Sequence, residues 1–178
     1  MKPTTTSQLH PLLEETLQGA TPSLSDFIAA FAGTFALLTR LEDTPQDPIW
    51  HAEGNVRVHT EMVLAQTYKL FQTEANHVEA TKRLTLILGA LFHDIAKPIC
   101  SKTELRNGRE RVTSPGHADK GRSYIAYKLL ELGISPVQAR EVMALVGHHH
   151  DPKKLVKKDK PASSYKKLAR LVDLELVY

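Results

Sequence analysis

The chain has 178 residues, 42% of them hydrophobic, and a formal net charge of +3 at neutral pH. This length suits one domain, residues 1–178, with a core large enough to need no covalent staples. A single cysteine, Cys100, excludes an internal disulfide, and the sequence has neither a signal-peptide pattern nor an apolar run long enough to cross a bilayer. We therefore expect a cytoplasmic protein that does not associate with membranes.

Apolar residues at helical spacing dominate the chain, so we expect an almost entirely helical protein. The first helix is expected to begin at Ser23 or Ser25, which can cap its N-terminus, and to end near Asp43. A second helix is expected over residues 55–71 and a third over residues 78–95. The first helix carries apolar residues at Phe27, Ile28, Phe31, Phe35 and Leu38.

The pattern changes between residues 103 and 113. Asn107-Gly108 is typical of a type I′ turn, so a short β-hairpin is expected there. Helical spacing then resumes over residues 117–132 and is stopped by Gly133.

Two further helices are expected toward the end of the chain. Ser135 can cap one of them, with Pro136 at its first position, and this helix should run to about Val146. Ser163 or Ser164 should cap the last helix. No stop signal precedes the final residue, Tyr178, which suggests that the natural protein continues.

Positive charge is concentrated near the C-terminal end. Residues 153–170 contain eight basic side chains and a single acid, Asp159. Such a segment is either a solvated surface or a binding surface for an anionic partner, such as a phosphorylated or nucleic-acid substrate. The basic residues are Lys153, Lys154, Lys157, Lys158, Lys160, Lys166, Lys167 and Arg170.

Side chains that bind metal ions are concentrated between residues 59 and 150. His59, His93-Asp94, His117 and the triplet His148-His149-His150 each lie on or beside an expected helix. Imidazole and carboxylate groups together suit transition metals, and separate helices of a bundle can bring them to one site. An ionised Asp94 at the end of the most apolar helix is costly unless it is paired or metal-bound. A structural zinc site is the competing explanation, but it usually requires several cysteines.

The segments around these residues resemble the HD-domain superfamily of metal-dependent phosphohydrolases, which are all-helical proteins named for the His-Asp dipeptide. The segments are WHAEGNVRVHT (50–60), LFHDIAKP (91–98), GH (116–117) and LVGHH (145–149). They are similar to the HD module of bacterial tRNA nucleotidyltransferases and poly(A) polymerases, and to the related module of polynucleotide kinase RNA end-healing enzymes. The resemblance covers residues 48–178 and implies an all-α HD bundle, with residues 1–47 as an N-terminal helical extension.

The resemblance also implies a metal centre of one or two divalent ions, which could be Mn, Ni, Co, Fe or Zn. Asp94 would bridge two ions and take part in catalysis together with Lys97, whose cation would meet the substrate phosphate. Asp173 would be the closing ligand, unless that ligand lies beyond Tyr178. The implied ligands are His59, His93, Asp94, His117 and His149, with His148 as the alternative to His149.

Substrate contacts are expected from His51, Lys97, Arg109 and Arg122, with Glu53 as a further candidate beside His51. Basic side chains on the hairpin and the following helix can bind a phosphate or an RNA strand. Each arginine is equally well described as a solvated charge. His51 and Glu53 could instead brace the start of the helix that carries His59.

The function implied by the resemblance is hydrolysis of nucleotide or RNA phosphoesters, in particular 2′,3′-cyclic phosphates and 2′- or 3′-terminal phosphates, in RNA repair or processing. Its partners would be nucleotide or RNA phosphate ends and, in a longer protein, a C-terminal kinase or other RNA-processing domain. Three alternatives stay open: a nucleoside monophosphate phosphatase, a di-iron enzyme that activates oxygen, and a non-catalytic RNA-binding or regulatory HD domain.

Overall fold

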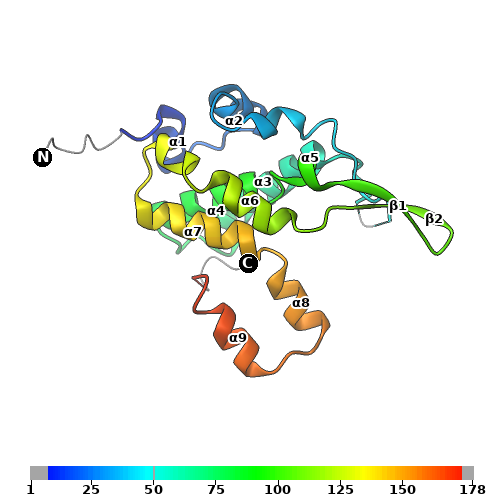
Figure 1. Ribbon diagram of the computed structural model, residues 1–178. Coiled ribbons are helices and arrows are strands. Elements are labelled where there is room, and N and C mark those ends of the chain that lie inside the picture. Colours follow the sequence, from blue (N-terminus) through cyan, green and yellow to red (C-terminus); the bar gives the residue numbers. More distant parts are fainter. Residues whose placement is uncertain (1–7, 50, 174–178) are drawn as a thin grey trace, which may run out of the picture.

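The computed structural model describes residues 8–49 and 51–173. The described chain is mostly helical with one two-stranded antiparallel hairpin, which confirms the predicted fold class (Figure 1). The strands are β1 (Lys102–Arg106) and β2 (Arg109–Thr113). The helices are α1 (Pro11–Leu17), α2 (Leu24–Phe31), α3 (Val56–Thr73), α4 (Ala80–Phe92), α5 (Lys97–Cys100), α6 (His117–Ile125), α7 (Pro136–His148), α8 (Asp151–Lys157) and α9 (Ala162–Leu168), with 3₁₀ turns η1 (Ala36–Arg40) and η2 (Lys128–Leu132).

Helix α4 is the centre of the bundle. It packs against α3 on one side and α7 on the other, and α7 also packs against α6. The approach of α4 to α7 is close at Gly89, where an added Cβ would come within 2.9 Å of Leu145 Cδ1. A larger residue at position 89 would therefore push Leu145 away. The buried side of α4 consists of Leu84, Thr85, Ile87, Leu88, Gly89, Leu91 and Phe92.

A row of aromatic rings joins the N-terminal segments to the end of α4. Phe27 and Phe31 on α2 lie 5.7 Å apart between ring centroids, Phe31 lies 6.4 Å from Phe35, and Phe35 lies 4.6 Å from Phe92. All four side chains are almost fully buried. The segment before α3 therefore shares one hydrophobic core with the later helices, and it fixes the residue that directly precedes His93.

The first predicted helix is only partly correct. Ser23 caps α2 in a reciprocal capping box with Asp26, so Ser25 is not the cap. The helix ends at Phe31 rather than near Asp43, and a turn leads into η1. Gly33 and Thr34 in this turn are weak helix formers, and the interruption places Phe35 against Phe92.

The predicted helix over residues 117–132 is also interrupted. Helix α6 ends at Ile125 and η2 follows, up to Gly133, which adopts φ +79° as a stop signal should. The prediction for α7 is confirmed, because Ser135 accepts a hydrogen bond from the Gln138 N–H as its N-cap. This helix extends two residues beyond the expected end at Val146.

The last part of the chain differs most from expectation. Neither Ser163 nor Ser164 caps a helix, because α9 already begins at Ala162 after Pro161. The preceding helix α8 was not predicted. Figure 1 shows α8 and α9 extending from the bundle as a pair. The predicted continuation of the last helix through residues 174–178 lies outside the described residues.

The hairpin follows its predicted turn. Asn107 and Gly108 have φ values of 52° and 73°, as a type I′ turn requires, and Arg106 pairs with Arg109 across it. The Nε–H of Arg111 on β2 donates to the buried carboxylate of Asp47. This ion pair anchors the hairpin to the segment that leads into α3.

The Asp47 anchor should make the hairpin sensitive to pH. The hydrogen bond from Arg111 lowers the pKa of Asp47, although burial opposes the shift. A carboxyl group with a depressed pKa stabilises the fold above its unfolded pKa, about 3.9, and loses this contribution as the pH falls through its lower folded pKa. Hydrogen exchange at the hairpin amides, corrected for intrinsic rates, should show unchanged protection down to about pH 4 and a decrease below it.

The Asp47→Asn variant should show weaker hairpin protection already at neutral pH. Glu110→Gln, at an exposed position on β2, is the control and should behave like the wild type. Equal protection in wild type and Asp47→Asn would contradict the anchoring role.

Phe92 should be a main contributor to stability. Phe92→Ala removes a fully buried ring from the contact with Phe35, and it should lower the free energy of unfolding by about 3–5 kcal/mol. Val137→Ala, at an exposed position of α7, should change it by no more than about 0.5 kcal/mol. Urea unfolding followed by circular dichroism measures both, and a similar small effect at the two positions would contradict the assignment.

Candidate metal centre

The His-Asp pair lies where α4 ends. The helix was expected to reach residue 95, but it stops at Phe92, and His93 is its C-cap. Asp94 follows in the turn before α5 and is 2% exposed. This early end of the helix lets both side chains face the same buried site.

The two oxygens of Asp94 face different groups of side chains. Oδ2 lies 3.2 Å from His93 Nε2, 3.7 Å from His59 Nε2 and 2.8 Å from Lys97 Nζ. Oδ1 lies 3.2 Å from His117 Nε2 and 3.9 Å from His149 Nε2. Four helical segments, α3, α4, α6 and α7, therefore converge on one carboxylate, in an arrangement that suits a bridge between two cations.

Hydrogen bonds orient the imidazole rings. The Nδ1 atoms of His93, His117 and His149 each lie 2.7 Å from a backbone carbonyl oxygen, those of Ala90, Ser114 and Val146 respectively. Since a carbonyl oxygen only accepts, Nδ1 of each ring carries a hydrogen, and Nε2 faces Asp94. Such contacts are typical of metal-binding histidines.

His59 is held in the same way by a carboxylate. Its Nδ1 lies 2.7 Å from Glu53 Oε1, and the Nδ1 of His51 lies 2.9 Å from the same oxygen. Burial opposes ionisation of Glu53, but hydrogen bonds from its own backbone N–H and from both histidines lower its pKa to about 2. Glu53 is therefore an anion that fixes the tautomers of His51 and His59.

Three groups of donor atoms could each hold a cation. Within each group the donor atoms lie within 4.8 Å of one another. In the described part of the chain, His93 Nε2 and both Asp94 oxygens are buried without a hydrogen bond. Lys97 Nζ forms an ion pair with Asp94 Oδ2 at 2.8 Å, and divalent cations would satisfy the remaining atoms, since unsatisfied buried polar atoms are costly. The groups are His59-His93-Asp94, His117-His149-His150 and His51-Glu53-His59.

The protonation states also suit a metal centre. Burial is the main cause that lowers the pKa of His149 to about 3, and the nearby His93 adds to it. Burial, with a smaller contribution from His117, lowers the pKa of His150 to about 4. Burial disfavours charge on His93 and Asp94, but their mutual attraction prevails: the pKa of His93 is raised and that of Asp94 lies well below its usual value. The centre therefore offers an anionic carboxylate at Asp94 and neutral imidazoles at His149 and His150.

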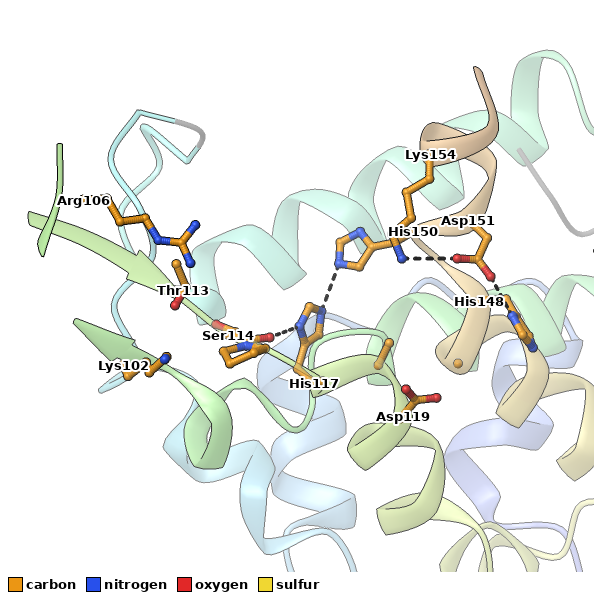
Figure 2. A pocket seen from close by; sticks show the side chains of 14 residues that line it. Lys102, Arg106, Thr113, Ser114, His117, Asp119, His148, His150, Asp151 and Lys154 are labelled. Carbon is orange, nitrogen blue, oxygen red and sulfur yellow. Dashed lines mark hydrogen bonds and ion pairs between the residues drawn. The ribbon is translucent and has the colours of Figure 1, made fainter. Parts of the chain in front are cut away.

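The three histidines of the triplet have different partners. His149 lies at Asp94, whereas His148 turns toward Asp151 Oδ2, 2.8 Å from its Nδ1 (Figure 2). The Nε2 of His150 lies 3.1 Å from the Nε2 of His117. No role of its own was predicted for His150, because α7 ends at His148 and helical spacing no longer predicts the direction of the following side chains.

The ammonium group of Lys97 supplies a positive charge at Asp94. It is 7% exposed, and its ammonium group donates to the side-chain oxygen of Gln46 as well as pairing with Asp94. Gln46 lies before the segment that resembles the family, and a glutamine carries no metal-binding signal. The contact between Lys97 and Gln46 could therefore not be predicted from the sequence.

Three predicted site residues do not line the cavity of the centre. Arg109 lines a separate cavity at the hairpin, and Arg122 Nη2 lies 3.8 Å from Asp119 Oδ1 on α6. Asp173 Oδ2 lies 3.0 Å from Lys82 Nζ. None of them belongs to the three donor groups found among residues 8–49 and 51–173. His51, in contrast, lines the cavity of the centre together with Lys97.

The arrangement of histidines around the buried Asp94 places this helical bundle in the class of helical proteins that can bind metal ions. A model of the HD domain family matches residues 56–175, and the chain therefore belongs to the HD domain family, whose members are generally metal-dependent hydrolases. No curated protein and no solved structure gives a significant match to the chain. No helix in the described part of the chain is both long and apolar enough to span a membrane.

Two adjacent histidines provide a matched test of the centre. His149→Ala should weaken binding of Mn²⁺ or Zn²⁺, measured by isothermal titration calorimetry, by at least about tenfold, because it removes a donor at Asp94. His148→Ala should change the affinity by no more than about twofold, because His148 pairs with Asp151. Equal losses in the two variants would contradict the placement of the triplet.

Proposed function

We propose that the protein is a metal-dependent phosphohydrolase acting on nucleotide or RNA phosphoesters, with 2′,3′-cyclic and 2′- or 3′-terminal phosphates as its preferred substrates. The observation that carries this proposal is the buried Asp94, whose two oxygens face two groups of histidines. Such a donor set suits two divalent ions, and bound ions would supply a hydroxide near neutral pH and neutralise charge on a phosphoryl group.

Residues of the chain have distinct roles in this proposal. Asp94 and the surrounding histidines, His59, His93, His117 and His149, hold the metal, and His150 completes the group around His117. Lys97 lines the cavity, and its buried ammonium group can turn from Asp94 to a phosphoryl oxygen of the substrate. His51, held by Glu53 through Nδ1, lies at the same cavity and can accept a hydrogen bond from a substrate hydroxyl at Nε2.

The charge around the cavity supports a nucleic-acid substrate. All eight basic side chains of residues 153–170 are exposed, and they lie on α8, α9 and the adjoining turns. We call this part the α8–α9 arm. Its first lysine, Lys153, lines the cavity of the metal centre, and Lys154 lines the neighbouring cavity in Figure 2. A strand bound along the arm would bring its phosphate end to Asp94.

A nucleoside monophosphate phosphatase is the second candidate. It is favoured by the size of the cavity at the metal centre, about 420 Å³, which suits a single nucleotide. The two candidates differ in the use of the α8–α9 arm, because only an RNA substrate has phosphates to place along it.

Turnover tests the proposal directly. With Mn²⁺, Ni²⁺, Co²⁺, Fe²⁺ or Zn²⁺, the protein should open 2′,3′-cyclic nucleotides or release phosphate from RNA 2′- or 3′-ends. Asp94→Asn keeps the side-chain volume but removes the charge, and it should lower kcat/KM by at least about a thousandfold. Competition between 3′-phosphorylated RNA and mononucleotides separates the two candidates.

The control is Asp159→Asn, on the exposed part of the arm, which should retain full activity. Absence of turnover with every metal, in folded protein shown by calorimetry to bind the ion, would overturn the proposed hydrolase.

A further inference from the structure

The cavity of the metal centre continues into an apolar half. Its lining changes from histidine, aspartate and lysine at one end to aliphatic side chains at the other. We call the aliphatic end the apolar chamber. Its described lining consists of Val63, Thr67, Leu86, Ala90, Leu145, Leu168 and Val172.

We propose that the apolar chamber binds the base of the nucleotide whose phosphate is at the metal centre, and that it does so without selecting among bases. This inference rests on the proposed function, because it assigns the organic part of the same phosphoester. Three features support it: the position of the chamber beside the metal centre, the residues that close the chamber, and the apolar character of its lining.

The chamber lies along the ligand-bearing faces of two helices. On α3, Val63 and Thr67 follow His59 at intervals of four residues, which places all three side chains on one face. On α4, Leu86 and Ala90 precede His93 at intervals of four and three residues. A phosphate at the metal centre would therefore have its attached group beside these apolar positions.

Residues of α7, the end of the α8–α9 arm and Val172 complete the apolar chamber. Leu145 on α7 lies against α4 at Gly89, where the missing side chain leaves Leu145 its space. Leu168 at the end of α9 and Val172 beyond it are 7% and 6% exposed and line the same cavity. The arm that carries the basic surface thus also closes the apolar chamber.

The chemistry of the chamber fits a base held by its faces. Aliphatic walls exclude a second phosphate, because burial of an unpaired charge is costly. Thr67 Oγ1 donates its hydrogen to the Val63 carbonyl oxygen, at 2.8 Å, so it has only acceptor capacity left. Among the described lining residues of the chamber, no amide or charged side chain is placed to distinguish one base from another. The chamber would therefore recognise a base by its size and by apolar contact.

The size of the cavity sets the length of the bound unit. A volume of about 420 Å³ is at the lower end of the range, about 300–1,000 Å³, of small-molecule sites. One nucleotide fits this space, whereas a continuous strand does not. The remaining phosphates of an RNA would lie outside, next to Lys153 and the exposed lysines of the α8–α9 arm.

The test compares two adjacent residues that follow the α8–α9 arm. Val172→Phe fills the chamber, whereas Leu171→Phe adds the same ring at a position that is 47% exposed and outside the chamber. The affinities of Mn²⁺-loaded protein for non-hydrolysable 3′-phosphonate analogues of 3′-AMP and 3′-UMP, and for inorganic phosphate, are measured by isothermal titration calorimetry. Ala90→Leu, which fills the chamber from α4, replaces Val172→Phe if that variant is not folded by circular dichroism.

We expect wild type to bind both nucleotides at least about tenfold more tightly than phosphate, with the two nucleotides within about threefold of each other. Val172→Phe should lose at least about tenfold in nucleotide affinity and retain its affinity for phosphate. Leu171→Phe should match the wild type in all three affinities.

Four outcomes would overturn the inference. These are unchanged nucleotide affinity in Val172→Phe, an equal loss for nucleotides and phosphate, a preference of more than about tenfold for one base, or phenyl phosphate binding as tightly as the nucleotides. The last outcome would show a chamber for any apolar ester group. Since all readouts are binding affinities, a lack of turnover would overturn the proposed hydrolase without deciding the role of the chamber.

Discussion

The burial of one charged carboxylate governs the organisation of this protein. Asp94 sits at the end of the most buried helix, where an isolated anion would be very costly. Its charge is balanced by Lys97 and by histidine rings from four helical segments, so the bundle must bring α3, α4, α6 and α7 together at this point. The backbone carbonyls that accept from the rings are part of the same arrangement, because they direct each Nε2 toward the carboxylate.

The segment before α3 takes part in this arrangement. Its aromatic row holds Phe92, the residue before His93, and its end supplies Gln46 to Lys97. Asp47, the next residue, holds the hairpin through Arg111. The family match begins at residue 56, so these contacts come from residues that precede the matched part. They tie the helical core, the hairpin and the centre to one short stretch of backbone.

Features set by local chemistry could be predicted from the sequence, and features set by packing could not. Ser135 as a cap and Asn107-Gly108 as a turn depend on a few neighbouring residues, and both predictions are confirmed. The breaks after Phe31 and Ile125 depend on which side chains must reach the core, so helical spacing alone missed them. The same holds for the site: the His-Asp pair was visible as a motif, whereas Gln46 and the position of His150 required the folded chain.

The contact of Lys97 with Asp94 has a consequence for how the protein is assembled. An internal ammonium group already neutralises the buried carboxylate, so charge balance within the core does not depend on a metal ion. Small zinc-dependent domains, in contrast, gain their folding free energy from the ion itself. In this protein, folding can therefore precede the binding of a metal ion.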